Sequence, residues 1–233
     1  MAPSLTQRRK LETRQGLLAG AYRVFGQKGY AQATVDDVAA AAGVSKGAVY
    51  HHFASKEELF RALLADHGHE LDAMAAAVKR ARSFAELVRG VVAVWIHHYR
   101  SDALFVPLSL ESRLQAMREP WAREIVGEFY EQLRALVAGL LRIGQDTGFV
   151  RPELDVDAAA VLLFGVLDGA CLQAAIDPAR VPLDAVETPL VDLVQRYVAG
   201  KRKGDLRRLR AALGPRLEHS ALRGGPPSRA LGE

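Results

Sequence analysis

The sequence predicts an all-α protein with a small N-terminal three-helix head and a larger C-terminal helical bundle. Apolar residues recur at helical spacing through most of the chain, and capping residues and prolines divide these stretches into separate helices. No stretch alternates apolar and polar residues for long enough to predict a strand. With 233 residues, 49% of them apolar, the chain is long enough to bury a sizeable core beside a small head.

The head begins with a helix whose apolar stripe includes Leu17, Ala21 and Phe25 and which ends at Gly29 and Tyr30. The second helix starts after Thr34, a good N-cap residue, with Asp37 three positions later as in a capping box. We expect a sharp reversal after this helix.

Gly43 supplies that reversal, because glycine adopts the left-handed conformation that commonly ends a helix. Val44 then fills the angle between two helices, and Ser45 caps the next helix, Lys46 to His52. This helix is expected to turn Val49 inward and to present small and polar residues outward. Its outer face therefore offers hydrogen-bond donors without large side chains that would prevent close approach. The pattern is that of a helix-turn-helix, whose second helix can lie in the major groove of DNA.

A further capping box, Ser55 with Glu58, starts another helix and places Lys56 beside its positive N-terminus, where a phosphate is favoured. The alternative reading is a plain corner of a helical bundle, since many αα-turns contain Gly followed by Ser. Such a corner gives no reason to gather lysine, tyrosine and histidine around one small helix face. The gathered residues are Lys46, Tyr50, His51, His52 and Lys56.

Over about residues 10 to 65 the sequence resembles the TetR-type transcriptional regulators. The resemblance implies a dimeric DNA-binding protein whose body dimerises and holds a small effector, and whose two heads move apart when the effector binds. It is carried by Leu17-Leu18, Ala21, Phe25, Gly29-Tyr30, Thr34-Val35, Val38-Ala39, Ala42 to Ser45, Gly47, Tyr50, His52-Phe53, Lys56 and Leu59.

We expect Lys46 and His51 to contact base edges, and Gly47 and Ala48 to permit close approach and touch a thymine methyl. Phosphate contacts are expected from Thr34, Tyr50, His52 and Lys56. The predicted DNA-binding set is Thr34, Ser45, Lys46, Gly47, Ala48, Tyr50, His51, His52 and Lys56. A basic run can add phosphate or minor-groove contacts or can be only a solvated tail, and it comprises Arg8, Arg9, Lys10 and Arg14.

Composition limits the other classes of function. Lys and Arg number 31 against 27 acids, a net charge of +4, so nucleic-acid binding requires local basic patches. No apolar run is expected to approach the roughly 20 residues of a membrane span, and the N-terminus lacks the apolar core of a signal peptide. The single cysteine, Cys171, excludes an internal disulfide and is expected to be a small buried apolar residue in a reducing cytoplasm.

The motifs of common enzyme classes are absent: there is no glycine-rich phosphate loop, G-x-S-x-G, H-E-x-x-H or cysteine cluster. Neither an enzyme nor a cofactor is therefore expected. The pairs His67/His69 and His97/His98 suggest a metal site at first sight, but residues one or two apart on a helix point in different directions. No metal site is predicted.

The remaining helices can be placed from caps, prolines and glycines. Their expected ranges are Glu57 to about Arg82, Ser83 to about Arg100, one or two helices within 103–118, Glu119 to Thr147 before Gly148, Asp155 or Asp157 to about Ile176, and Leu183 to Ala199. The helix ranges predict three parts of the chain. A DNA-binding domain is expected at 10–56, with the helix-turn-helix at 34–53, and an effector-binding and dimerisation domain at 57–200. A basic, loose tail is expected at 201–233.

The helices at about 156–176 and 183–199 are the expected dimer interface. The first is apolar on nearly all sides and has small residues that permit close helix approach, and the second has one apolar stripe. The alternative is that both helices belong to the core of a single chain. A dimer is favoured because one short helix binds DNA weakly, whereas two heads on a two-fold axis can read a palindromic operator.

The effector is expected to be a small apolar or amphipathic molecule, with Arg113 available for an acidic group on it. The alternatives are that the pocket residues are plain core and that the protein is a ligand-independent adaptor or an activator with the same head. An enclosed cavity of several hundred cubic ångströms favours a sensor, and a filled core favours an adaptor. The candidate pocket residues are Trp95, His98, Tyr99, Phe105, Ser109, Arg113, Met117, Trp121, Phe129 and Phe164.

Overall fold

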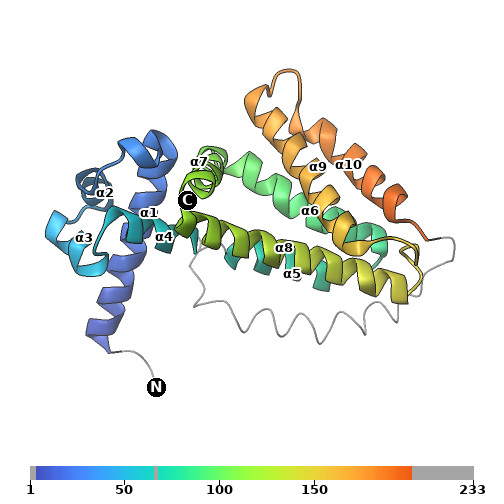
Figure 1. Cartoon of the computed structure of the whole chain (residues 1–233), viewed down its shortest axis with the longest axis horizontal. Helices are drawn as coiled ribbons and strands as arrows, with labels where there is room; N and C mark the ends of the chain where they lie inside the picture. The colour runs from blue at the N-terminus through green and yellow to red at the C-terminus, as the bar shows by residue number, and fades with distance from the viewer. Residues whose placement is uncertain (1–3, 66–67, 201–233) are drawn as a thin grey trace. The chain divides into compact units, whose positions relative to one another are not determined.

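The computed structural model of the chain describes residues 4–65 and 68–200, and within them it contains helices and no strand (Figure 1). Val150 and Ala199 form one isolated antiparallel bridge. The all-α prediction is confirmed. The helices are α1 Leu5–Gln32, α2 Val35–Ala42, α3 Lys46–His52, α4 Lys56–Leu64, α5 Gly68–Arg80, α6 Phe84–Ser101, α7 Phe105–Arg118, α8 Pro120–Asp146, α9 Val156–Ile176 and α10 Leu183–Val198.

These helices form two compact units. The first takes its described residues from Met1–His67 and Asp102–Phe129, and the second from Gly68–Ser101 and Tyr130–Glu233. This division differs from the expected boundary at residue 56, because α7 and the start of α8 pack with the head. The Tyr22 hydroxyl on α1 donates to Asp102, and the ring of Trp121 lies near Tyr30 and Phe60 with centroids 6.3 and 6.1 Å apart.

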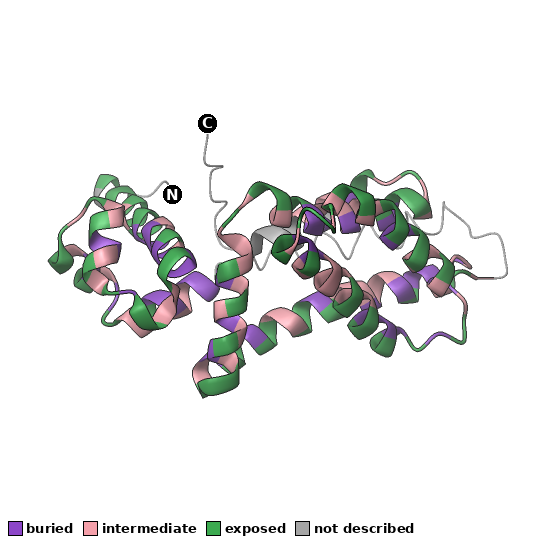
Figure 2. Cartoon of the chain, turned by 90° about the horizontal axis from the view of Figure 1, so that it is seen from above, coloured by how far each residue is buried: buried purple, intermediate pink, exposed green. Residues whose placement is uncertain are grey.

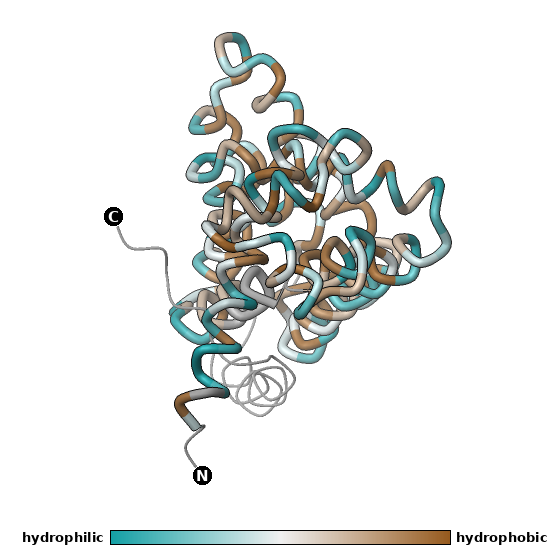
Figure 3. The backbone as a smooth tube through the Cα atoms, turned by 90° about the vertical axis from the view of Figure 1, so that its left-hand side faces the viewer, coloured by the Kyte–Doolittle hydropathy of each residue, from teal (hydrophilic) through white to brown (hydrophobic). Residues whose placement is uncertain are grey.

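The core of the first unit forms where α1 meets α2 and α4, and α3 packs against α2. Phe25 and Phe60 are almost fully buried and meet edge to face with ring centroids 4.9 Å apart, a favourable aromatic geometry. Leu17 and Val38 are also fully buried, as the helical spacing predicts. Buried and exposed segments alternate along the helices in Figure 2, and apolar and polar segments alternate in Figure 3, as expected of amphipathic helices.

The predicted capping box at Ser55 forms with a shift of one residue. The Ser55 hydroxyl accepts the Glu58 N–H at 3.0 Å, but the Glu58 carboxylate accepts from Ala54 and not from Ser55. Ser83 and Glu86 repeat this arrangement, with Glu86 accepting the N–H of Arg82. Both serines therefore cap their helices, while each glutamate satisfies the amide one position before the N-cap.

The predicted single helix from Glu57 to about Arg82 is wrong. The chain instead forms α4, which ends at Leu64, and α5, which begins at Gly68, a residue with poor helix propensity. Within residues 103–118 the chain forms one helix, α7, which begins at Phe105. Asp155 is the residue that caps α9, its carboxylate accepting the N–H groups of Asp157 and Ala158 at 3.1 Å. The predicted tail at 201–233 and His67 lie outside the described residues.

The second unit is built from α5, α6, most of α8, and the antiparallel pair α9 and α10. The bridge at Val150 brings the segment after α8 to the end of α10, and Val150 and Val198 are buried there together. Gly148 has a φ of 81° two residues after the end of α8, which confirms it as the glycine that stops that helix.

Helix α9 is apolar on nearly every side and is mostly uncovered within this chain. By length and composition it is long and apolar enough to cross a membrane, so the expectation that no apolar run approaches a span is wrong. Only 22% of its most apolar window is buried. Val161, Leu162 and Val166 are 55%, 56% and 42% exposed. An apolar helix with so little cover within its own chain requires another apolar surface.

Cys171, on α9, is fully buried, as expected from its apolar surroundings. Burial raises the pKa of its thiol to about 12, and the nearby Asp168 carboxylate adds to the shift. Because the thiolate is the reactive form, we expect native protein at pH 8 to react with a disulfide-based thiol reagent at least about a hundredfold more slowly than urea-unfolded protein. Equal rates, measured by absorbance of the released thiolate, would contradict this burial.

Candidate nucleic-acid interface

The reversal between α2 and α3 has the geometry predicted for a helix-turn-helix. Gly43 lies in the left-handed region at φ 68° and ψ 29°. Its N–H donates to Ala40 and the N–H of Val44 donates to Ala39, at 3.2 and 3.0 Å, so the last carbonyls of α2 are satisfied. Ser45 then caps α3 by accepting the N–H of Ala48 at 3.2 Å. The turn thus fixes where α3 begins.

Helix α3 has one buried side and one exposed side. Val49 and the following Phe53 are 1% and 3% exposed and anchor the helix in the core. Tyr50 is 49% exposed, although it is a large aromatic residue. On the outer face, Lys46, Gly47, Tyr50 and His51 are exposed, and Ala48 and His52 are half-buried. The arrangement places small residues and hydrogen-bonding groups together on an accessible helix surface.

Lys46, at the start of α3, is paired with Asp36 on α2. Its Nζ lies 2.8 Å from an oxygen of the Asp36 carboxylate, and both side chains are largely exposed. This hydrogen bond raises the pKa of Lys46 above its usual value. The sequence reasoning assigned Lys46 to a base edge but did not predict its acidic partner.

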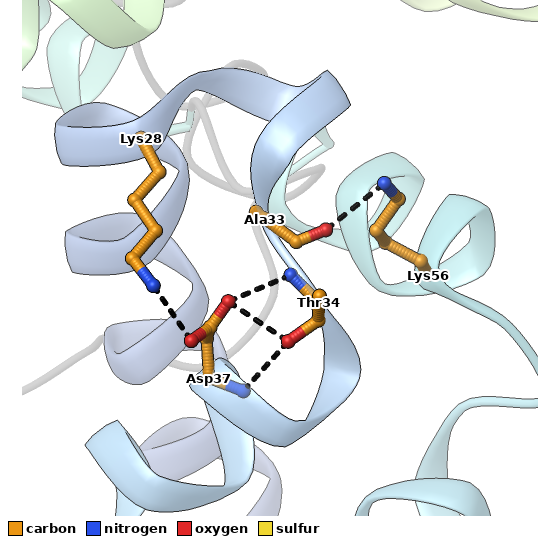
Figure 4. A network of polar contacts seen from close by, with 5 residues as sticks. All are labelled: Lys28, Ala33, Thr34, Asp37 and Lys56. Atoms are coloured by element: carbon orange, nitrogen blue, oxygen red, sulfur yellow. Dashed lines mark hydrogen bonds and ion pairs between the residues drawn. The ribbon is translucent and has the colours of Figure 1, made fainter.

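The start of α2 is held by a second acidic residue (Figure 4). Asp37 accepts from the backbone N–H and the hydroxyl of Thr34, while the hydroxyl accepts the N–H of Asp37 at 3.1 Å. Lys28 on α1 donates to the same carboxylate at 2.6 Å. The Lys28 hydrogen bond, followed by those from Thr34, lowers the pKa of Asp37 to about 2. Because the Thr34 hydroxyl proton is already donated, the expected phosphate contact requires that proton to change partner.

Lys56 is also engaged within the head (Figure 4). Its Nζ donates to the carbonyls of Tyr30 and Ala33 at 2.8 and 3.0 Å and lies 4.5 Å from the centre of the Tyr30 ring. The amine therefore satisfies the end of α1, where Gly29 has a φ of 75°. One of its three N–H groups remains for a phosphate.

Basic residues of α1 lie near α3. The guanidinium of Arg14 sits 5.4 Å from the centre of the Phe53 ring. Partial burial lowers the pKa of His52, and the positive charges of His51, Lys10 and Arg14 lower it further. The combined positive potential of His51, Lys10 and Arg14 would attract a phosphate group to the position beside His52.

The predicted effector residues divide between the two units. Phe105, Ser109, Arg113, Met117, Trp121 and Phe129 belong to the first unit, and Trp95, His98, Tyr99 and Phe164 to the second. Met117 is 78% exposed. Trp95 packs edge to face on Phe164 with ring centroids 5.0 Å apart, and Tyr99 donates to Asp168 at 2.8 Å.

A cavity of about 90 Å³ lies within the second unit, and of the ten predicted residues only Phe164 lines it. All of its lining side chains are apolar. The apolar stripes of α6 and α8 are the sequence signal for this site, but a stripe does not distinguish lining from core. The lining includes Val88, Val92, Leu133, Val137, Leu167 and Leu190. Among the described residues, no group of three or more His, Cys, Asp or Glu is placed to hold a metal ion.

Comparisons with known proteins cover both parts of the chain. A family model described as bacterial regulatory proteins, tetR family, matches residues 17–63, and one described as the C-terminal part of BetI-type transcriptional repressors matches residues 84–201. The transcriptional repressor AcnR of Corynebacterium efficiens is 30% identical over 188 residues, which are 81% of this chain and 93% of that protein.

Solved structures of regulators share the fold. A TetR transcriptional regulator from Chloroflexus aurantiacus is 26% identical with a TM-score of 0.71, covering 83% of this chain and 99% of its own. A transcriptional regulator from Saccharomonospora viridis, solved in complex with choline, is 21% identical with a TM-score of 0.73, covering 82% and 99%. The second likeness concerns the fold alone.

The contrast between Lys56 and Lys46 predicts different effects on stability. Lys56→Met keeps the aliphatic stem but leaves two carbonyls at the end of α1 without their donor, and we expect it to lower the free energy of unfolding by about 1–3 kcal/mol. Lys46→Met removes only an exposed ion pair and should lower the free energy of unfolding by much less. Urea unfolding followed by circular dichroism measures the free energy of unfolding of both variants. Equal losses would show that the Lys56 contacts stabilise the head no more than the exposed ion pair of Lys46 does.

Proposed function

The chain belongs to the TetR family of bacterial regulatory proteins, and on that premise we propose that it binds a palindromic operator as a homodimer and leaves it when a small apolar effector occupies the body. It is a DNA-binding transcriptional repressor, and its family and relatives are DNA-binding regulators, not enzymes. We place its action in the cytoplasm, where the operator DNA is.

The observation that carries the proposal is the exposed face of α3 on a fully capped turn. A short helix anchored by Val49 and Phe53, with Gly47 and Ala48 on its accessible side, can approach base edges closely. We assign Lys46 and His51 to base edges. Phosphate contacts are assigned to Thr34, Tyr50, His52 and Lys56, with Ser45 at the cap between the two groups.

Dimerisation is proposed through α9 and α10. Both helices expose apolar side chains, with Leu162 and Ile176 on α9 being 56% and 73% exposed and Leu193 on α10 45% exposed. A second copy can cover this face by placing its own α9 and α10 against it around a two-fold axis, in a four-helix interface. Such burial explains a helix of membrane-like composition in a regulator that works on DNA.

The effector is proposed to occupy the cavity of the second unit. Its lining offers methyl, methylene and aromatic surfaces, which suit an apolar molecule. The cavity volume of about 90 Å³ lies between the two expectations: it is smaller than the several hundred cubic ångströms that favour a sensor, but the core is not completely filled. A ligand of more than a few heavy atoms must therefore displace side chains, and this displacement is the change that reaches the heads.

The experiment that tests the function is an electrophoretic mobility shift on DNA flanking the gene for this chain. We expect a saturable, sequence-preferring band for the wild type. Lys46→Ala should relax discrimination at one operator position, whereas Tyr50→Phe should weaken binding similarly on all sequences, because a phosphate contact carries no base information. A wild type without sequence preference would reject the proposal, and equal losses for Lys46→Ala on every site would reject its base-edge role.

The dimer face is tested by replacing an exposed apolar residue with a charged one. Leu162→Glu should shift the protein from dimer to monomer in sedimentation velocity at micromolar concentration, because the carboxylate would be buried against an apolar partner. Met117→Glu, at a residue that is 78% exposed in the first unit, is the matched control and should leave the dimer intact. A dimeric Leu162→Glu protein would move the interface elsewhere.

A further inference from the structure

The pair formed by Asp36 and Lys46 joins two helices of the head at the point where DNA is expected. The two residues are ten positions apart, on α2 and α3, and their charged atoms are 2.8 Å apart. Their side chains are 63% and 54% exposed, so both remain accessible to an incoming duplex. An acidic group in this place repels phosphates, and its presence on a DNA-binding surface requires an explanation.

Formation of the helix does not explain it, because the neighbouring residue has that task. Asp37 closes the capping box with Thr34 and pairs with Lys28 on α1. The carboxylate of Asp36 instead accepts from Lys46 at the first position of α3. An acid in the first turn also interacts favourably with the helix dipole, but that effect is independent of Lys46.

The pairing separates two properties of a lysine. The amine has three N–H donors, of which one is used by Asp36, so two remain for acceptors on a base edge. Its positive charge is compensated by the carboxylate. Non-specific DNA binding depends on the charges that neutralise phosphates, whereas base reading depends on placed donors.

We propose that Asp36 is a specificity-determining residue, which holds Lys46 as a hydrogen-bond donor toward the bases and cancels its charge toward the phosphate backbone. This inference rests on the proposed base-edge role of Lys46. Specificity is the difference between operator and non-specific affinity, and Asp36 increases it by weakening the second more than the first.

The test compares wild type and Asp36→Asn on random-sequence duplex DNA between 50 and 200 mM salt. Releasing one lysine charge per head should raise the affinity for random DNA and make the slope of log affinity against log salt steeper by about 0.9 per head. Over this fourfold range of salt, that slope adds about a 3.5-fold loss of affinity per head. The preference for operator over random DNA should fall.

Two controls separate this role from a general change of charge. Asp157→Asn makes the same charge change in an exposed inter-helix pair, with Arg142, in the second unit, and should leave the slope unchanged. Asp36→Glu keeps the carboxylate and should behave as the wild type. Thermal melting of each variant checks that the head remains folded.

A double-mutant cycle with Lys46→Ala tests whether Asp36 acts through the lysine. In the Lys46→Ala background, Asp36→Asn should change the salt slope by much less than 0.9 per head. An unchanged slope for Asp36→Asn alone, or the same change with and without Lys46, would overturn the inference. Because random DNA is the probe, this result does not depend on finding the operator. A wild type without sequence preference in the mobility shift would reject the proposed function, and it would do so for any value of the salt slopes.

Discussion

The left-handed turn at Gly43 is the constraint on which the candidate DNA-binding surface of α3 depends. At φ 68° a side chain with a Cβ is strained, although no neighbouring atom would meet a Cβ placed there, so the requirement for glycine comes from the backbone. The turn directs Val49 into the core and Tyr50 outward on the same short helix. A different backbone conformation at this point would change the direction of every side chain on α3 at once. Hydrogen bonds at the end of α2 and the Ser45 cap at the start of α3 stabilise the turn on both sides.

Three lysines of the head perform three different tasks, and charge alone does not distinguish them. Lys28 ties α1 to the acidic start of α2, and Lys56 satisfies carbonyls at the end of α1. Lys46 is the one of the three whose amine is held on the exposed side of α3 by a carboxylate. On the proposed function, DNA binding therefore depends on where a few cations are placed, as expected for a chain with a net charge of only +4.

The sequence predicted the parts of the fold that local chemistry determines. The caps at Thr34, Ser45 and Asp155 and the stops at Gly43 and Gly148 all form, because a cap or a left-handed glycine depends on its immediate neighbours. The break after α4 and the lining of the cavity in the second unit could not be predicted by the same reasoning. An apolar stripe shows that a helix face is covered, but whether it meets a cavity, a core or another chain depends on residues distant in the sequence. The Asp36 pair was missed for the same reason, since nothing in a spacing of ten residues predicts contact across a turn.

Helix α9 shows how the body can connect its two proposed partners. Phe164 and Leu167 line the cavity, Leu162 lies on the exposed apolar side, and Val166 does both, lining the cavity while 42% exposed. On the proposed function, effector and second subunit therefore contact the same helix from different sides. A ligand that enlarges a cavity of about 90 Å³ must push on its walls, and α9 is a wall that is shared with the interface. On this proposal, such a shift changes how the two subunits meet, and the spacing of the two heads changes with it.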